Sequence, residues 1–271
     1  MKKALAVLLA LMLACLMLAG CGAKFNSLEK IQQNGKIVYY TDAVWAPFEY
    51  IGAGGQPEGV DVDIARRIAE EIGVELEIVN ASFDGFALAL KNNQADIAIA
   101  AITITPERAE EVDFSMPYID ARQYIVVPAA DTTTETLDDL AGKRIGVHLG
   151  TTGDFLVTDE IAEGVLTDTG ATVVQYKSLQ EGCLAMLAGH LDAIVVDTLL
   201  AENLVAVNPG LKCFEAGYDA GPLEEEFLGV AVAKGNDTLL EVVNKVLEEM
   251  LASGEIEASL LYHTENASLV Q

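Results

Sequence analysis

An arginine stands beside a predicted helix start in the stretch TITPERAEEVDFSMPY, residues 103–118. Thr105 followed by Pro106 predicts a helix that begins here, with the threonine hydroxyl as its cap and the proline in its first turn. Arg108 would then lie where the helix macrodipole favours negative charge, and a cation there costs roughly 0.3–1 kcal/mol. Free N–H groups and the planar donor fork of an arginine together suit one bound carboxylate, whose charge would reverse this cost.

Arg108 also has a purely structural interpretation. It could pair with Glu110 or Glu111 on the surface, an arrangement that is common and nearly neutral in energy. An exposed helix start would more simply carry an acid at this position. The sequence therefore favours anion binding as the role of Arg108.

Other polar and aromatic residues stand just after predicted strands. They are Asp42, Trp45, Phe83, Thr103, Gly150, Thr152 and Asp197. In open α/β sheets, ligands bind outside the carboxyl ends of the strands. We therefore interpret this set, together with Arg108, as a candidate binding site.

The residue types in this set suit a zwitterionic ligand. Arg108 would hold a carboxylate, with further N–H donors from the GTTG segment at residues 150–153, and Asp197 would hold an ammonium group. Trp45 and Phe83 could enclose a side chain of aliphatic, aromatic or cationic character. A carboxylate and an ammonium group at opposite ends of one ligand describe an amino acid.

Most of these residues also have a structural alternative that the sequence leaves open. Asp42 could cap a backbone turn, and Trp45 could belong to the core, as could Phe83. Thr152 and Asp197 could each be no more than the N-cap of the helix that follows.

Strand and helix patterns alternate along the chain, which predicts an α/β protein with mostly parallel sheets. Strands are expected at 36–42, 74–81, 96–103, 144–150, 172–177, 192–197 and 227–235, and helices at 61–73, 84–92, 151–162, 178–190 and 238–251. In the helix at 61–73, isoleucines at 64, 68 and 72 share one face.

The order of elements suggests two lobes of similar topology. ALKNNQADIAIA (residues 89–100) and MLAGHLDAIVVD (residues 186–197) share a pattern: a helix end, a polar turn, an aspartate and an apolar strand. The helix at 238–251 has no strand partner in the second lobe, so we expect the chain to return to the first. That return requires two crossings between the lobes, near 118–122 and 224–228, with a cleft between them.

Catalytic and metal-binding patterns are not found in the sequence. His148, His190 and His263 are scattered without metal-ligand spacing, although His148 lies close to the expected cleft. The chain contains no G-x-S-x-G, Walker or G-x-G-x-x-G stretch. No cofactor or metal is therefore expected.

The net charge of −26 excludes a nucleic-acid partner, because no basic run counters it. The chain opens with Lys2 and Lys3, sixteen apolar residues and Gly20-Cys21, the pattern of a secretory signal peptide over residues 1–20. The apolar run is shorter than a membrane-spanning helix requires. LAGC at residues 18–21 resembles the lipobox of bacterial lipoproteins, which implies cleavage before Cys21, lipidation of that residue and anchoring to the outside of the cell membrane.

Cys183 and Cys213 are the cysteines that remain inside the expected globular part. An exported protein could join them in a disulfide, and their spacing matches no metal site. Cys183 lies on the apolar face of a predicted helix and Cys213 in a short strand. Two buried thiols are the interpretation that we favour, with a disulfide as the alternative.

At these residues the chain resembles the extracytoplasmic solute-binding proteins of polar amino-acid ABC importers, family 3. The resemblance extends from about residue 36 to residue 259. It is carried by TDAVWAPFEY, GVDVDIARRIAEEIGVELE, GKRIGVHLGTTG and, most specifically, SFDGFALALKNNQADIAIAAITITPERAEEVDFSMPY. It implies a two-lobed periplasmic-binding-protein-like fold of type II with a double-crossover hinge.

The resemblance also implies roles for single residues. It gives the ligand carboxylate to Arg108, to the backbone and hydroxyl of Thr103 and to Thr152. It gives the ammonium to Asp197 and the carbonyl of Ala101. Asp42 would reach a polar side-chain group of the ligand, and Gly150 would permit close backbone approach.

Some features depart from the family pattern. Ala101 stands where many members have glycine or serine, the C-terminal LLYHTENASLVQ lacks an aromatic ending, and GPLEEEFLG is unusually acidic. These departures leave the ligand identity open, and Asp42 with Trp45 favours a polar or basic amino acid.

The expected protein is a monomeric lipoprotein that captures a free amino acid and delivers it to an ABC permease in the membrane. We expect a linker at 21–35, a first lobe at 36–121 and 227–271, and a second lobe at 122–226. The alternative is an enzyme on the same scaffold, similar to cyclohexadienyl dehydratase. That enzyme would need an acid over the cleft centre, for which Glu49 and Asp154 are the candidates.

Overall fold

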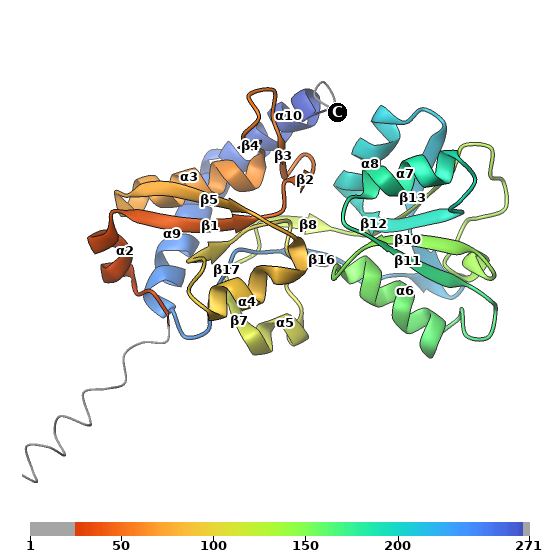
Figure 1. Ribbon diagram of the computed structural model, residues 1–271, viewed down its shortest axis with the longest axis horizontal. Coiled ribbons are helices and arrows are strands. Elements are labelled where there is room, and N and C mark those ends of the chain that lie inside the picture. Colours follow the sequence, from red (N-terminus) through yellow and green to blue (C-terminus); the bar gives the residue numbers. More distant parts are fainter. Residues whose placement is uncertain (1–24, 268–271) are drawn as a thin grey trace, which may run out of the picture.

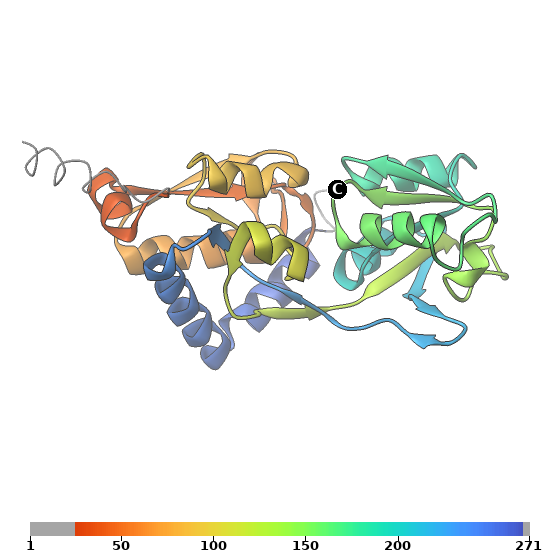
Figure 2. The ribbon, with the colours of Figure 1, turned by 90° about the horizontal axis from the view of Figure 1, so that it is seen from below.

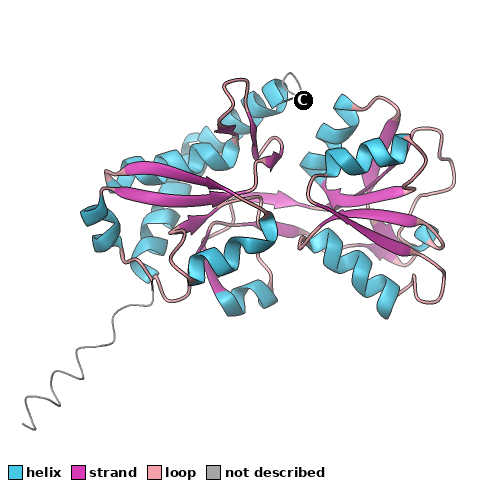
Figure 3. Ribbon diagram, in the orientation of Figure 1, coloured by secondary structure: helices cyan, strands magenta, loops and turns pink. Residues whose placement is uncertain are grey.

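The computed structural model describes residues 25–267, so Cys21 and the expected signal peptide lie outside the described residues. The described chain forms two bodies, each around a five-stranded sheet with helices on its faces (Figures 1 and 3). We call the body that begins with residue 28 lobe 1 and the body around residues 123–215 lobe 2. Among the described residues, no helix has the length and apolar content needed to cross a membrane.

The sheet of lobe 1 is mixed rather than mostly parallel. Its strands are β1 (Lys36–Thr41), β5 (Glu75–Asn80), β6 (Ile97–Ala98), β7 (Val112–Phe114) and β17 (Ala231–Ala233), in the order β5-β1-β6-β17-β7. β1 is parallel to β5 and β6. β17 is antiparallel to both β6 and β7, because the chain re-enters lobe 1 from the opposite direction.

Lobe 2 repeats this plan. Its strands are β9 (Gln123–Pro128), β10 (Arg144–His148), β11 (Thr172–Tyr176), β12 (Ala193–Asp197) and β13 (Leu211–Glu215), in the order β11-β10-β12-β9-β13. β10 is parallel to β11 and β12, whereas β9 is antiparallel to β12 and β13. The sequence analysis missed β9, which takes in this lobe the place that β17 takes in lobe 1.

Two short strands connect the lobes. β8 (Ile119–Ala121) and β16 (Glu226–Leu228) pair antiparallel with each other. Figure 2 shows the two segments side by side as they run between the bodies. The expected return of the chain to lobe 1 through a second crossing is confirmed by this pair and by the position of β17.

The helices of lobe 1 follow the apolar pattern of the sequence. They are α2 (Leu28–Asn34), α3 (Val60–Ile72), α4 (Phe86–Lys91), α5 (Pro106–Glu111), α9 (Asp237–Ser253) and α10 (Glu255–Ala267), with a 3-10 turn η1 (Phe83–Gly85). In α3 the three isoleucines of the predicted face are buried, and Gly73 ends the helix in the left-handed conformation. α2 replaces part of the expected linker at 21–35, because Ile31 packs into the core.

The helices of lobe 2 are α6 (Thr152–Ala162), α7 (Leu179–Leu187) and α8 (Thr198–Val207), with a 3-10 turn η2 (Asp138–Leu140). Three smaller strands, β2 (Val44–Trp45), β3 (Glu49–Ile51) and β4 (Pro57–Glu58), form a separate sheet in lobe 1. β14 (Gly217–Tyr218) and β15 (Gly221–Pro222) form a hairpin before the second crossing.

The two cysteines inside the described chain are free thiols. Cys183 is buried in the core on α7, and burial raises the pKa of its thiol to about 12. Cys213 lies half-buried on β13. The interpretation as two thiols is therefore confirmed, and neither thiol is in the reactive thiolate form at neutral pH.

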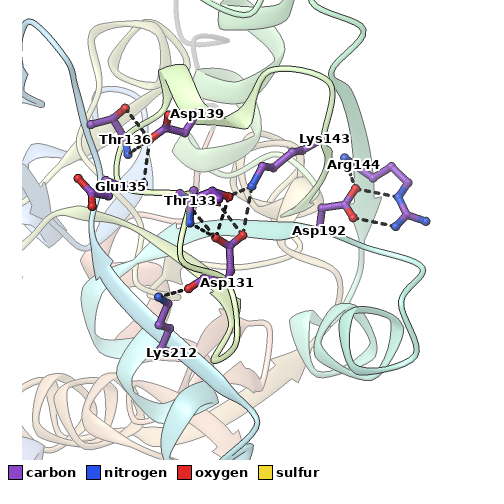
Figure 4. Close-up of polar contacts among 10 residues, drawn as sticks. Asp131, Thr133, Glu135, Thr136, Asp139, Lys143, Arg144, Asp192 and Lys212 are labelled. Atoms are coloured by element: carbon purple, nitrogen blue, oxygen red, sulfur yellow. Dashed lines mark hydrogen bonds and ion pairs between the residues drawn. The ribbon is translucent and has the colours of Figure 1, made fainter.

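A carboxylate fixes the loop that follows β9 in lobe 2 (Figure 4). Asp131 accepts hydrogen bonds from the backbone N–H groups of Thr133, at 2.7 Å, and Thr134, at 3.0 Å. It also accepts from both hydroxyls and from Lys143, at 3.2 Å, while its carbonyl accepts from Lys212. Burial opposes ionisation of Asp131, but these donors outweigh it and hold the pKa below its usual range.

Replacing Asp131 with alanine is expected to destabilise lobe 2 by about 1–3 kcal/mol, because the buried Thr134 and the partly buried ammonium group of Lys143 lose a charged acceptor. Urea unfolding measures this loss, and Asp131→Asn, which keeps one acceptor oxygen, should lose less. The lowered pKa means that the stabilisation is present above pH 4 and is lost as the pH falls through the folded-state value. Equal stability of wild type and Asp131→Ala at pH 7 would contradict this role.

Candidate binding site

A cavity lies between the lobes, a position where small-molecule sites commonly form. Lobe 1 contributes Trp45, Phe83, Ala100, Ala101, Thr103 and Arg108, and lobe 2 contributes Gln123, Thr151, Thr152, Gly153, Val196 and Asp197. Seven of the predicted site residues thus line one cavity. The other two, Asp42 and Gly150, lie next to it without lining it.

Arg108 enters the cavity from α5, which begins as the sequence predicts. Thr105 caps the helix by accepting from the backbone N–H of Arg108 at 3.2 Å, and Pro106 is its first residue. The guanidinium donates to the carbonyl of Thr103 at 2.7 Å and to the carbonyl of Gly150, in lobe 2, at 3.1 Å. It lies 5.3 Å from the centre of the Phe83 ring, a cation–π distance.

Within the described chain, Arg108 forms no ion pair. Burial lowers the pKa of its guanidinium to about 10, although the nearby charge of Glu226 opposes the shift. A buried cation held only by neutral carbonyls gains most from an added carboxylate. The site therefore favours an anionic group beside Arg108.

The start of α6 faces Arg108 across the cavity and supplies further donors. The N-cap of this helix is Thr151, not Thr152 as the structural alternative supposed, and its hydroxyl accepts from the N–H of Asp154 at 3.3 Å. The N–H groups of Thr152 and Gly153 are in the first turn, where helices leave donors unpaired. A Cβ at Gly153 would lie 2.9 Å from Gln123 Oε1 and 3.0 Å from the carbonyl of Val195, so glycine permits this close packing.

The hydroxyl protons of Thr103 and Thr152 are already used in hydrogen bonds and are not available to a ligand in the cavity. Both donate to the same oxygen of Glu226, at 3.1 Å and 3.0 Å. A hydroxyl has a single proton to donate, so in this structure the two threonines offer the cavity only lone pairs. A ligand carboxylate would be held by Arg108 and by backbone N–H groups instead.

Asp197 provides the opposite charge at the other end of the cavity. Its Oδ1 caps α8 by accepting from the N–H of Leu200 at 3.3 Å, and its Oδ2 accepts from Trp45 Nε1 at 2.7 Å across the lobes. Both the capping and the cleft interpretation of Asp197 therefore hold. Burial raises the pKa of this carboxyl to about 7, so a cation in the cavity would stabilise its ionised form.

Ala101 occupies a backbone conformation that favours glycine, with φ of 45°. Its N–H donates to Asp61 at 2.7 Å, and the same carboxyl accepts from the hydroxyl of Tyr118 at 2.8 Å. Burial raises the pKa of Asp61 to about 6 and raises that of neighbouring Glu49 as well. These contacts fix the cavity wall at Ala101, and its carbonyl remains a candidate ammonium acceptor.

Asp42 faces His148 rather than the cavity. It accepts from the N–H of Phe83 at 2.8 Å and lies 3.6 Å from Nε2 of His148, which comes from lobe 2. The imidazole is buried between the rings of Trp45 and Phe83, at centroid distances of 5.1 Å and 6.1 Å. His148 was expected close to the cleft, and in the structure it lies beside Trp45 and Phe83, where a ligand side chain was expected.

Gly150 contributes its backbone, as expected of a close approach between the lobes. It has φ of 81°, and a Cβ there would lie 3.3 Å from the Cβ of Asp84 in lobe 1. Its carbonyl accepts from Arg108 and its N–H donates to Asp154. A larger residue would therefore strain the backbone and hinder closure.

The two acids considered for an enzyme lie outside the cavity. Glu49 is buried beside Asp61, and Asp154 accepts from the N–H of Gly150 and from Gln175 within lobe 2. Among the described residues, Asp197 is the acid that lines the cavity. No group of three or more described His, Cys, Asp or Glu residues is arranged to hold a metal ion.

Two lobes joined by paired crossing strands, with opposite charges facing each other in the cavity between them, define a two-lobed binding protein of the periplasmic type. Residues 37–263 match the family of bacterial extracellular solute-binding proteins, family 3, and the chain belongs to this family. Members of this family are extracytoplasmic solute-binding proteins.

Individual relatives cover most of the chain. The L-cystine-binding protein TcyJ of Escherichia coli K12 is 30% identical over 233 residues, covering 85% of this chain and 83% of its own. ABC transporter arginine-binding protein 1 of the same strain is 32% identical over 219 residues, 81% and 86% of the two chains. The structure of AbpA from Streptococcus pneumoniae bound to L-arginine superposes with a TM-score of 0.82 at 29% identity, covering 90% of this chain and all of that one.

Proposed function

We propose that this protein captures a free L-amino acid outside the cytoplasm and delivers it to an ABC permease. The observation that carries the proposal is the buried Arg108, which has no ion pair in the described chain and faces Asp197 in the same cavity. Arg108 and the N–H groups of Thr152 and Gly153 would take the carboxylate, and Asp197 would take the ammonium. These are the two charged groups that every amino acid carries.

Among amino acids, we propose one with a cationic side chain, with arginine as the first candidate. Asp42, Asp197 and Glu226 place more negative than positive charge around the cavity, which favours a ligand with net positive charge. Trp45 and Phe83 present ring faces on which a guanidinium can stack. The binding of arginine by two of the relatives supports this choice.

We further propose that lipidation of Cys21 anchors the protein to the cell membrane and that it acts as a monomer. The leader pattern over residues 1–20 supports the anchor. We propose the lobe limits expected from the sequence, 36–121 with 227–271 for lobe 1 and 122–226 for lobe 2, except that lobe 1 begins with α2 at residue 28 rather than at residue 36. The positions of the crossing strands β8 and β16 support these limits.

We do not propose the dehydratase-like enzyme. Its candidate acids, Glu49 and Asp154, are engaged in contacts behind the cavity wall. The relatives support binding without catalysis, in which the ligand is recovered unchanged.

A thermal-shift panel of the twenty L-amino acids and L-cystine tests this function. A ligand at 100 times its Kd adds about 2.7 kcal/mol of stability, which for a protein of this size corresponds to a rise in Tm of roughly 5–10 °C. We expect such a shift with L-arginine. Two matched controls should give none: agmatine, which lacks the carboxylate, and Nα-acetylarginine, which lacks the charged ammonium.

The pattern of shifts decides between the parts of the proposal. A shift with another amino acid but not with arginine would retain amino-acid binding and refute the ligand choice. An agmatine shift as large as that of arginine would refute the carboxylate role of Arg108. No shift with any compound, on protein freed of bound ligand by unfolding and refolding, would refute amino-acid capture.

A further inference from the structure

We propose that Glu226 is a positioning residue on the hinge that holds hydroxyl groups of both lobes and thereby stabilises the closed arrangement. Glu226 is the first residue of β16 and pairs with Ala121 of β8, so it stands on the crossing strands themselves. Its effect on closure stands on the geometry alone. Its effect on ligand affinity rests on the proposed function.

The donors that surround Glu226 come from both lobes. Thr103 belongs to lobe 1 and donates to Oε2 at 3.1 Å. Thr152, at the start of α6, and Gln123, at the start of β9, belong to lobe 2. Thr152 donates to the same Oε2 at 3.0 Å, and the Gln123 amide donates to Oε1 and Oε2 at 3.1 Å and 3.2 Å.

Thr103 is attached to the strand that carries Glu226. It forms a β-bridge with Leu228, flanked by hydrogen bonds from Ile104 N to Phe227 O and from Gly229 N to Ile102 O. Thr103 therefore keeps its place beside Glu226 when the lobes move. Thr152 sits on a helix of lobe 2 and would leave Glu226 on opening, so its bond exists only when the lobes are closed.

Glu226 lies behind the cavity wall. Thr103, Gln123 and Thr152 line the cavity, whereas Glu226 is not among the lining residues of the described chain. Hydrogen bonds to an ionised carboxylate are roughly twice as strong as neutral ones. The charge of Glu226 also lies close enough to Arg108 to counter the effect of burial on its pKa. Closing the lobes thus brings donors to a charge that is already present at the hinge.

Two other cross-lobe contacts join residues of the ligand site and would be rearranged when a ligand enters. Trp45 bonds to Asp197, and Arg108 bonds to the carbonyl of Gly150. Glu226 itself does not line the cavity, although its three donors do. A ligand held by Arg108 and by backbone N–H groups can therefore enter without breaking the Glu226 contacts. Ligand-free and ligand-bound closed states would share them.

Small-angle X-ray scattering and calorimetry on wild type, Glu226→Ala, Glu226→Gln and Glu224→Gln test this inference. Glu224 is an exposed neighbour, so its change removes the same charge from the same segment. We expect Glu226→Ala to have a larger ligand-free radius of gyration and a Kd for L-arginine about tenfold higher, since the closed state would be less populated. Glu226→Gln, which retains one acceptor oxygen, should fall between, and Glu224→Gln should match wild type.

Thr152→Val and Thr152→Ser provide an independent pair. Valine removes the hydroxyl and should reproduce the larger radius of Glu226→Ala, whereas serine keeps the hydroxyl and should match wild type. Circular dichroism establishes that each variant is folded. If Glu226→Ala leaves the ligand-free radius unchanged, the hinge role is overturned.

A tighter Kd in Glu226→Ala would also overturn the proposal, because Glu226 would then compete with the ligand carboxylate for the two hydroxyls. Should wild type bind no amino acid at all, the proposed function fails. The ligand-free radius of gyration still decides the hinge role in that case, so the two failures are distinguishable.

Discussion

Replacing Arg108 with methionine is expected to weaken amino-acid binding by about 2–5 kcal/mol, the usual cost of removing one partner of a buried, hydrogen-bonded charge pair. This corresponds to a rise in Kd of roughly 30- to 5,000-fold. Methionine retains an unbranched apolar stem, so the loss reports the guanidinium, which lies over the Phe83 ring. Isothermal titration calorimetry with the ligand found in the thermal-shift panel measures it.

Two further variants sharpen the Arg108 experiment. Arg108→Lys keeps the charge but loses the planar fork, and we expect an intermediate affinity. Arg66→Met removes an exposed arginine that pairs with Asp63 on the surface of α3, and it should bind as wild type does. A Kd for Arg108→Met within threefold of wild type would remove Arg108 from the site.

The unliganded stability of Arg108→Met separates binding from folding. In the ligand-free protein the guanidinium is a buried charge without an ion pair in the described chain, and burial lowers its pKa to about 10. Such a charge contributes little to stability or reduces it. We therefore expect the ligand-free Tm to change far less than the affinity.

Much of the site was predictable because its signals are local in sequence. A threonine and a proline define the start of α5 and thereby place Arg108. The strand β12 ends at Asp197, and the GTTG segment leads into α6, so both lie at sheet edges where ligands bind. Local propensity and the carboxyl-end rule predicted six of the seven expected site residues that line the cavity, and the family resemblance added Ala101.

The remaining features depend on contacts between distant segments. Glu226 joins Thr103 across 123 positions, and Trp45 reaches Asp197 across 152. The sequence showed GPLEEEFLG only as an acidic stretch, without indicating which of its acids turns inward. His148 faces Asp42 because the two lobes close on each other. The apolar pattern of β10, which carries His148, does not predict a contact with the other lobe.

Some elements were missed for a related reason. β9 follows a crossing strand directly, so its pattern merges with that of the hinge, and only its pairing with β12 and β13 defines it. α2 and α10 lie at the two ends of the described chain. Both are held by packing onto lobe 1, Ile31 from α2 and Ile256 from α10. α2 also has a local signal that the prediction did not use, since Ser27 caps it by accepting from the N–H of Lys30 and Gly35 ends it in the left-handed conformation.

Raised carboxyl pKa values around the cavity predict how ligand-free stability depends on pH. Burial raises the pKa of Asp197 from 3.8 to about 7 and that of Asp61 to about 6, and it raises that of Glu49. Such groups hold their protons more tightly in the folded state, so stability falls as the pH rises from about 4 to about 7. Asp131 and Asp192, whose pKa values are lowered, act in the opposite direction at lower pH.

The affinity for the ligand should depend on pH in the opposite direction and increase as the pH rises, because an ammonium group stabilises the ionised form of Asp197. Below pH 7 the ligand must displace the proton of Asp197, so we expect Kd to rise by roughly tenfold for each pH unit between 7 and 5. Calorimetry at several pH values measures the slope. It also yields the number of protons released on binding, which should approach one at pH 5.

Asp197→Asn is the decisive variant, because it removes the charge with little change of shape. Its single acceptor oxygen can keep either the cap of α8 or the bond from Trp45, and its amide NH2 then faces the other N–H donor. At pH 8 we expect it to weaken binding by at least a hundredfold, consistent with about 2–5 kcal/mol for one partner of a buried charge pair. Its ligand-free Tm should fall less between pH 4 and pH 7 than that of wild type, since no carboxyl group at this position loses its proton. Asp120→Asn, an exposed acid on β8, is the matched control and should change neither quantity.

A variant with full affinity at pH 8 and the wild-type pH slope would place the ammonium elsewhere. Weak binding that keeps the slope would assign the slope to the buried pair Glu49 and Asp61 instead.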